Sequence, residues 1–329
     1  MSSHDCIPLP RADQPWVQVD FKDGGEVADQ VHLLTLEEIH AINAAIAAGR
    51  PLLVRGEPGT GKSQLARAAA KMLGRVFISH VVDSQTESRD LLWSFDAVHR
   101  LAEAQLAAAL RQEPETVREG LQVARFVQPG PLWWAFDWPG ASKQAALSGG
   151  EEPTQNDGGV WKNGSVFLLD EIDKAEPEVP NGLLGVLGNR VFTPKGHGQP
   201  VRANETLPLV IITTNEERAL PDAFLRRCLV LHLQLPQGET DLKKLLMQRG
   251  QAHFPQAGQG VLKEAADLLH THRRLAAEER ITPLPGQAEY LDLLRAVLKL
   301  GKSQNEQITM LQVVARFTLK KNADPKTLV

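Results

Sequence analysis

The sequence has few cysteines and no long apolar run. Its two cysteines, Cys6 and Cys228, lie far apart among 329 residues. This excludes a disulfide framework and predicts a reducing compartment, the cytoplasm. No run of about 18 apolar residues is present, so we expect no membrane-spanning helix. The first residues, Met-Ser-Ser-His-Asp-Cys, lack the basic and apolar regions of a secretory signal, which also favours a cytoplasmic protein.

An excess of basic charge is also missing. The chain has 36 Lys and Arg against 40 Asp and Glu, a formal net charge of −4. Bulk charge therefore gives no support for binding nucleic acid or an acidic membrane, although it does not exclude a local basic groove. Hydrophobic residues make up 42% of the chain, enough for a large core, and the length predicts two domains.

Short apolar runs alternate with helical or loop segments through the first two thirds of the chain. There are five such runs, at 51–54, 76–82, 166–170, 209–214 and 229–235. This alternation predicts an α/β fold, a parallel sheet with helices on both faces. Helical periodicity is also present at 36–46 and 64–73. After Pro236 it continues without strands at 239–249, 260–277 and 287–300, which predicts a small all-helical second domain.

These patterns set the expected domain boundaries. Residues 1–30 read as an extension with one short strand at 16–21, residues 31–236 as the α/β domain, and residues 237–329 as the helical domain, with a helix at 305–317 and a C-terminal tail. A long insertion interrupts the α/β domain at about 83–164. We expect two helices there, at 91–110 and 115–127, and a mobile loop at 141–164, which is rich in Gly, Ser, Asn, Asp and Glu.

A glycine-rich segment follows the first of the five strands. It reads Gly56-Glu-Pro-Gly-Thr-Gly-Lys-Ser63 and satisfies the pattern G-x-x-x-x-G-K-[ST] between a strand and a helix. In such a P-loop (Walker A motif), main-chain N–H groups and the helix N-terminus hold the phosphates of ATP. Lys62 is then expected to reach the β- and γ-phosphates and Ser63 to bind Mg²⁺. The nucleotide-binding candidates are Gly56, Glu57, Pro58, Gly59, Thr60, Gly61, Lys62, Ser63 and Gln64.

Two acids end the third predicted strand, as in a Walker B motif. The segment reads Val166-Phe-Leu-Leu-Asp-Glu-Ile-Asp173, so Asp170 and Glu171 lie at the carboxyl end of a buried strand, where α/β sheets bind ligands. Asp170 is suited to coordinate Mg²⁺, and Glu171 is suited to orient and deprotonate the attacking water. Asp173 could support this site or serve only the structure.

Together these motifs resemble those of AAA+ ATPases, and within that group most closely the MoxR-type proteins. The matching segments span roughly residues 32–300: the P-loop, Leu-Leu-Asp-Glu-Ile-Asp-Lys-Ala at 168–175, Thr-Thr-Asn-Glu at 213–216, Leu-Pro-Asp-Ala-Phe-Leu-Arg-Arg at 220–227, and Phe-Val-Gln-Pro-Gly-Pro-Leu at 126–132. The resemblance implies a three-layer αβα domain followed by a helical lid. It also implies a ring of subunits, a hexamer, with a chaperone-like role beside a von Willebrand A-domain partner.

The resemblance also implies roles for three further residues. Asn215 matches the sensor that helps to place the attacking water, the alternative being a cap of the following helix. Arg227, and with less support Arg226, matches the arginine finger that enters the neighbouring subunit's site. One feature departs from many AAA+ proteins: the stretch 282–289, where a lid arginine is usual, contains no Arg.

Aromatic and histidine residues give weaker signals. Four aromatic residues lie close together in one segment: Trp133, Trp134, Phe136 and Trp138. They could pack on the sheet or contact a bound peptide or base, and the same two alternatives apply to Trp93. His270 and His272 are two apart on a predicted helix and face different directions, so we expect no metal site beyond nucleotide-bound Mg²⁺.

Three functions fit these patterns. The first is an ATP-driven ring that remodels partner proteins. The second is a nucleotide-gated oligomeric switch with slow hydrolysis, which the missing lid arginine favours. The third is a nucleic-acid motor or clamp-loader-like subunit, which Arg-Arg-Cys-Leu at 226–229 also resembles but the charge balance disfavours.

Overall fold

A computed structural model describes residues 5–11, 14–21, 30–111 and 113–319. The expected C-terminal tail at 320–329 and part of the expected N-terminal extension lie outside these residues. The chain forms two compact units. The sheet unit consists of residues 1–9, 37–54 and 66–231, and the helical unit of residues 10–36, 55–65 and 232–329.

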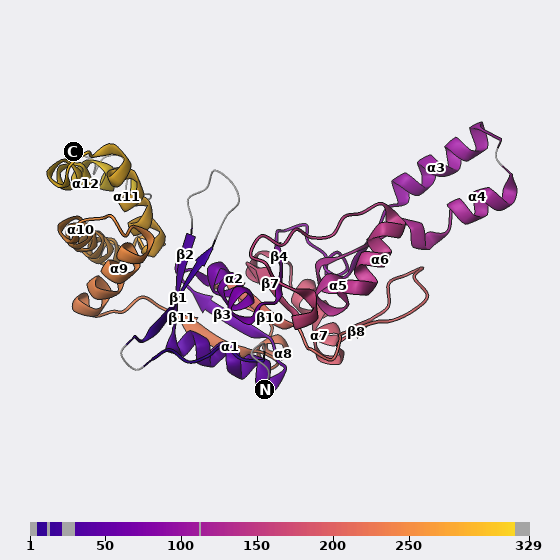
Figure 1. The fold of residues 1–329 in the computed structure, drawn as a ribbon, viewed down its shortest axis with the longest axis horizontal. Coiled ribbons are helices and arrows are strands. Elements are labelled where there is room, and N and C mark those ends of the chain that lie inside the picture. The colour runs from indigo at the N-terminus through magenta and orange to yellow at the C-terminus, as the bar shows by residue number, and fades with distance from the viewer. Residues whose placement is uncertain (1–4, 12–13, 22–29, 112, 320–329) are drawn as a thin grey trace. The chain divides into compact units, whose positions relative to one another are not determined.

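The main sheet has five strands in the order β11-β3-β10-β7-β4. Figure 1 labels each of them. They are β3 (Leu52–Gly56), β4 (Val76–Val81), β7 (Ser165–Asp170), β10 (Leu209–Thr214) and β11 (Leu229–Leu233). Strands β4 and β10 each run parallel to β7, with Val76 opposite Ser165 and Leu209 opposite Val166. Each predicted apolar run forms one of these strands, which confirms the α/β fold with parallel strands and flanking helices.

Helices cover this sheet and short elements connect them. The helices are α1 (Leu36–Ala48), α2 (Lys62–Leu73), α5 (Pro131–Phe136), α6 (Trp138–Ser148), α7 (Glu178–Asn189) and α8 (Asp222–Leu225), and a two-stranded ribbon pairs β8 (Val191–Phe192) with β9 (Val201–Arg202). Helix α5 packs on β4 and β7. All four aromatic side chains of its segment are buried with the sheet core, which confirms the packing interpretation: Trp133, Trp134, Phe136 and Trp138.

The first part of the insertion differs from the prediction. Helix α3 (Ala97–Ala109) begins six residues later than expected, because the Asp96 side chain accepts the N–H of His99 and caps the helix there. The preceding β5 (Trp93–Phe95) pairs with β6 (Val127–Pro129), and Trp93 packs against the core. The expected helix at 115–127 is shorter: α4 (Pro114–Gly120) ends at a glycine, and a 3₁₀ turn, η1 (Val123–Phe126), leads into β6. Helices α3 and α4 lie side by side (Figure 1).

The expected mobile loop at 141–164 is wrong in its first third, because α6 continues to Ser148 and ends at Gly149 in the left-handed conformation. The rest carries only a 3₁₀ turn, η2 (Trp161–Asn163), yet it is tied to the sheet unit. The Gln155 amide pairs with both the N–H and the carbonyl of Phe77 on β4, at 2.8 and 3.1 Å. Asp157 forms an ion pair with Arg67 at 2.6 Å. Side chains anchor this segment where the backbone is irregular.

The helical unit combines a hairpin with four helices. The hairpin pairs β1 (Trp16–Phe21) with β2 (Gln30–Thr35), and β1 has the predicted bounds. The helices are α9 (Glu239–His253), α10 (Gln259–Glu278), α11 (Gln287–Leu300) and α12 (Gln304–Thr318), which confirms the predicted helices of this region. Their core is mainly leucine, with Tyr290 fully buried. In the described part of the chain, no helix is both long and apolar enough to cross a membrane.

Candidate nucleotide site

The glycine-rich loop runs from the end of β3 to the start of α2, as the motif predicted. Gly61 has a φ of +97°, which strongly favours glycine and leaves main-chain N–H groups uncovered by a side chain. The Lys62 ammonium lies within the loop and donates to the carbonyls of Gly56 and Glu57, at 2.8 and 3.0 Å. The Thr60 hydroxyl also donates to Glu57, at 2.9 Å. These contacts shape the loop from within.

The charge at this loop favours an anion. Lys62 is only 7% exposed, and the 12-residue helix α2 directs the positive end of its dipole toward the loop. The Ser63 side chain is exposed in the first turn of α2. Pro58 and Gly59 are exposed at the tip, while Gln64 is half-buried. The arrangement fits phosphate oxygens held by N–H groups and an ammonium.

A neutral histidine lines one side of this loop. His32 on β2 is 5% exposed, and a Cβ placed on Gly61 would lie 3.4 Å from its ring carbon Cε1. Burial, with smaller contributions from the nearby Arg249 and His253, lowers the pKa of His32 to about 3. The imidazole is therefore neutral at physiological pH, because a second charge in this packed environment is unfavourable.

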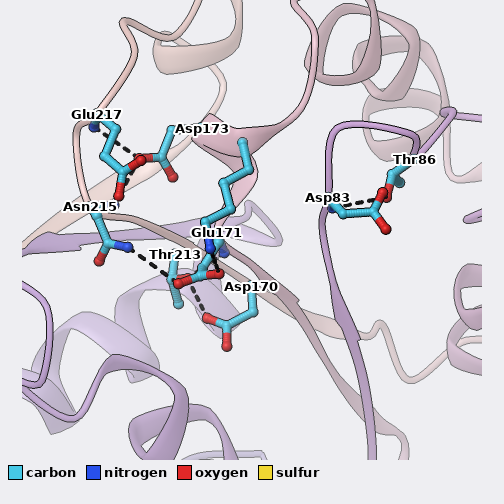
Figure 2. A network of polar contacts seen from close by, with 9 residues as sticks. Asp83, Thr86, Asp170, Glu171, Asp173, Thr213, Asn215 and Glu217 are labelled. Atoms are coloured by element: carbon cyan, nitrogen blue, oxygen red, sulfur yellow. Dashed lines mark hydrogen bonds and ion pairs between the residues drawn. The ribbon is translucent and has the colours of Figure 1, made fainter.

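Asp170 ends β7 and is oriented by the neighbouring strand β10. The Thr213 hydroxyl donates to Asp170 Oδ1 at 2.5 Å and accepts the main-chain N–H of Glu171 at 2.9 Å (Figure 2). The carboxylate of Asp170 is half-buried. One hydroxyl thus fixes both the side chain of the first acid and the backbone of the second.

Glu171 has a left-handed backbone, with a φ of +60°, which is uncommon for a residue with a side chain. The side-chain amide of Asn215 donates through Nδ2 to Glu171 Oε1 at 3.3 Å (Figure 2). The Lys174 ammonium donates to the other oxygen of the same carboxylate. Asn215 does not cap the following helix, because the N-cap of α8 is Pro221. The structure therefore brings together Glu171 and Asn215, 44 positions apart.

Asp173 holds the loop that carries Asn215 and Glu217. It is 2% exposed, and its Oδ2 accepts the main-chain N–H groups of Asn215 and Glu217, at 3.1 and 2.9 Å (Figure 2). Of the two roles left open for this acid, the contacts favour support of the Asn215 loop.

Arg226 and Arg227 follow α8, and both side chains are exposed. Their main-chain carbonyls accept hydrogen bonds from Arg50, whose Nε lies 3.1 Å from the carbonyl of Arg227. Arg50, Arg190 and Arg227 rim a hollow of about 250 Å³, and no acidic residue lines it within the described chain. Among the described residues, neither Arg226 nor Arg227 forms a side-chain ion pair, so both guanidinium groups are available to a partner.

Three residues that shape this site were not among the sequence candidates: Arg50, Lys174 and Thr213. Lys174 and Thr213 lie close in the sequence to the candidates Glu171 and Asn215. No signal existed for Arg50, because its partners Arg226 and Arg227 lie far away in the sequence.

Comparison with known proteins assigns the chain to a family. Residues 51–249 match the sequence model of the AAA domain, dynein-related subfamily. The chain belongs to this AAA family. A candidate ATPase from Cytophaga hutchinsonii is similar at 14% identity, covering 86% of this chain and 79% of that one, with a TM-score of 0.38. A RuvB point mutant from Thermotoga maritima is similar at 15% identity, covering 84% and 68%, with a TM-score of 0.45.

The AAA domain implies nucleotide binding, and the residues present fit a nucleotide with Mg²⁺. Ser63 and Asp170 each carry a hard oxygen donor of the kind that Mg²⁺ prefers. Among the described residues, no group of three or more His, Cys, Asp or Glu side chains could hold a metal ion.

Proposed function

We propose that this AAA domain binds Mg-ATP and hydrolyses it. The observation that carries the proposal is the contact of the Asn215 amide with the Glu171 carboxylate, beside an Asp170 held by Thr213. That pair offers a base for a water molecule and an amide to orient it. The glycine-rich loop, Lys62 and Ser63 offer the complementary phosphate and magnesium donors.

We infer further that the protein acts as a MoxR-type ring, a hexamer, that remodels or activates partner proteins. Exposed Arg226 and Arg227 support a trans role, since an arginine that stabilises charge in a neighbour's site must be uncommitted in its own chain. We propose that residues 31–236 form the AAA+ domain, that residues 237–329 form the helical lid and tail, and that residues 1–30 are an extension. A von Willebrand A-domain protein is the proposed partner class and the cytoplasm the proposed compartment.

The test is to separate binding from turnover. Binding of a fluorescent ATP analogue and phosphate release would be measured for the wild type, Lys62→Ala and Glu171→Gln, each with and without Mg²⁺. We expect Lys62→Ala to lose binding, and Glu171→Gln to bind normally but to release phosphate at least roughly a hundredfold more slowly. Lys143→Ala, an exposed lysine on α6, is the control and should match the wild type. A wild type that binds ATP with no Mg²⁺-dependent turnover would refute hydrolysis.

One contact favours a second candidate, a nucleotide-gated oligomeric switch. Lys174 pairs with the carboxylate of Glu171, so its ammonium occupies one of the two oxygens that could orient an attacking water. Slow turnover with ATP-dependent assembly is what such a switch requires. Oligomer mass measured with ATP, ADP and no nucleotide, together with the turnover rate, separates the two functions: a remodelling ring turns over quickly in one assembly, whereas a switch changes its mass with the nucleotide.

A further inference from the structure

An arginine of helix α10 is paired with the glutamate of the glycine-rich loop. Arg273 donates through one terminal nitrogen to both oxygens of Glu57, at 2.9 and 2.8 Å. The Arg273 side chain is 11% exposed and that of Glu57 39%. The two residues are 216 positions apart, and both belong to the helical unit. Breaking the pair would leave the largely buried guanidinium of Arg273 without its carboxylate partner, which is unfavourable.

The same arginine reaches the start of the next helix. Its other terminal nitrogen donates to the carbonyl of Pro285 at 3.0 Å, just before α11. Glu289 then closes that helix start, accepting the N–H of Gly286 at 2.9 Å. The first turn of α11 approaches the loop tip so closely that a Cβ on Gly59, where φ is +75°, would lie 2.8 Å from the Cβ of Ala288. Arg273 therefore joins α10, the start of α11 and the glycine-rich loop.

The negative charge of Glu57 is unfavourable for phosphate binding, and the contact with Arg273 offsets it. A carboxylate within a loop that binds a triphosphate repels the ligand, and the repulsion grows with the number of phosphate charges. Pairing with the guanidinium cancels that charge and also turns the carboxylate toward α10. Both effects act on the loop and neither requires Arg273 to touch the nucleotide.

We propose that Arg273 is a positioning residue for nucleotide binding: it neutralises Glu57 and holds the glycine-rich loop against the start of α11. The proposal rests on the proposed function, because it concerns affinity for nucleoside phosphates. It fixes the phosphate loop to helix α10 within the helical unit, although residues 282–289 contain no arginine.

The test is a double-mutant cycle read with AMP, ADP and ATP. Affinities would be measured by calorimetry for the wild-type chain, Arg273→Gln, Glu57→Gln and the double variant. We expect Arg273→Gln to weaken ATP binding by roughly tenfold or more, ADP less and AMP least, because an unpaired carboxylate repels in proportion to ligand charge. Glu57→Gln should cost less than about threefold, and the double variant should bind ATP better than Arg273→Gln alone.

A matched control lies one residue away. Arg274 makes an exposed ion pair with Glu278 on the same helix, so Arg274→Gln should leave all three affinities unchanged. If Arg273→Gln does not fold, Arg273→Lys keeps the charge but has one nitrogen where arginine uses two, so it cannot hold Glu57 and the carbonyl of Pro285 in the same way. It should show an intermediate loss for ATP.

Three outcomes decide the matter. Recovery of ATP affinity in the double variant, with losses that rise from AMP to ATP, supports the proposal. Equal losses for all three nucleotides, or a double variant no better than Arg273→Gln, overturn it and leave Arg273 as a packing contact only. A wild type that binds none of the three nucleotides would refute the proposed function itself, which is a distinct result.

Discussion

Asp173 holds the backbone of Asn215. Its Oδ2 accepts the N–H of Asn215 at 3.1 Å and that of Glu217 at 2.9 Å, and the acid is 2% exposed. Because the Asn215 amide touches Glu171, the position of the proposed base depends on an acid that does not itself contact it.

Replacing this acid should therefore harm both stability and turnover. Asp173→Ala leaves two N–H groups without their acceptor, and we expect a loss of about 2 kcal/mol in the free energy of unfolding. The Asn215 loop should also shift, so that the rate of ATP hydrolysis falls more than the affinity for ATP. Urea unfolding and steady-state kinetics check both effects. Asp292→Ala removes an exposed ion pair with Arg295 and should change the free energy by less than about 0.5 kcal/mol; an equal loss in both variants would contradict the assignment.

Arg50 should matter for turnover although it is remote from the acids. Its guanidinium fixes the carbonyls of Arg226 and Arg227, so Arg50→Gln should loosen the segment that carries the proposed trans arginines. We expect a lower kcat with little change in KM at high protein concentration. Arg202→Gln, an exposed arginine on β9, is the matched control. Should Arg50→Gln keep the wild-type kcat, the arginine segment does not depend on that contact.

A mixing experiment tests whether sites are shared between subunits. Arg227→Ala and Glu171→Gln should each be nearly inactive alone. In a mixed ring, a subunit with an intact Glu171 can lie beside a neighbour with an intact Arg227, so activity should return when the two variants are combined. The phosphate-release rate at varied mixing ratios measures this, with Arg226→Ala compared in the same assay. No recovery at any ratio, with Arg227→Ala fully active alone, would place each site within one chain.

Acid should weaken the fold through His32. Burial lowers the pKa of His32 to about 3, whereas the unfolded side chain binds a proton near pH 6.5. The folded-state pKa is the lower one, so the full stability is present above pH 6.5 and is lost as the pH falls toward 3, at up to about 1.4 kcal/mol per pH unit. Between pH 7 and pH 5 we expect a loss of about 2 kcal/mol from this residue.

His32→Gln should flatten that dependence even if it lowers stability at every pH, and urea unfolding at several pH values checks it. His253, whose pKa burial lowers to about 4, with Arg295 and Arg249 adding to the effect, should add a second slope in the same range. His40→Gln, on the exposed face of α1, serves as the control. An unchanged slope in His32→Gln would show that another group governs the acid sensitivity.

Local patterns predicted the sheet strands, the glycine-rich loop and the lid helices because each is encoded within a few consecutive residues. The errors occur where a distant contact or a single cap decides. Periodicity placed a helix over 91–96, but Trp93–Phe95 pairs with Val127–Pro129, and Asp96 caps the helix that follows. Composition predicted a loop from Ala141, although α6 continues until Gly149 allows it to end.

In the candidate site, too, the features encoded by nearby residues were predicted and those that depend on distant contacts were not. Glu171 and Asn215 were predicted separately from their motifs, and Lys62 from its loop. The pairing of Arg273 with Glu57 spans 216 positions and could not be predicted, because no period or motif connects a mid-helix arginine to a loop glutamate. Asp173 was ambiguous in the sequence, since an acid that binds a ligand and one that binds main-chain N–H groups look alike there.

The Gln155 side chain has a consequence for solubility. Strand β4 is an edge of the main sheet, and an uncovered edge invites a strand from another molecule. By bonding both the N–H and the carbonyl of Phe77, the amide of Gln155 occupies the place that such a strand would take. A side chain from an irregular segment thus hinders the pairing of this edge with a strand of another copy. Loss of the Gln155 side chain would therefore increase self-association more than it would destabilise the isolated molecule.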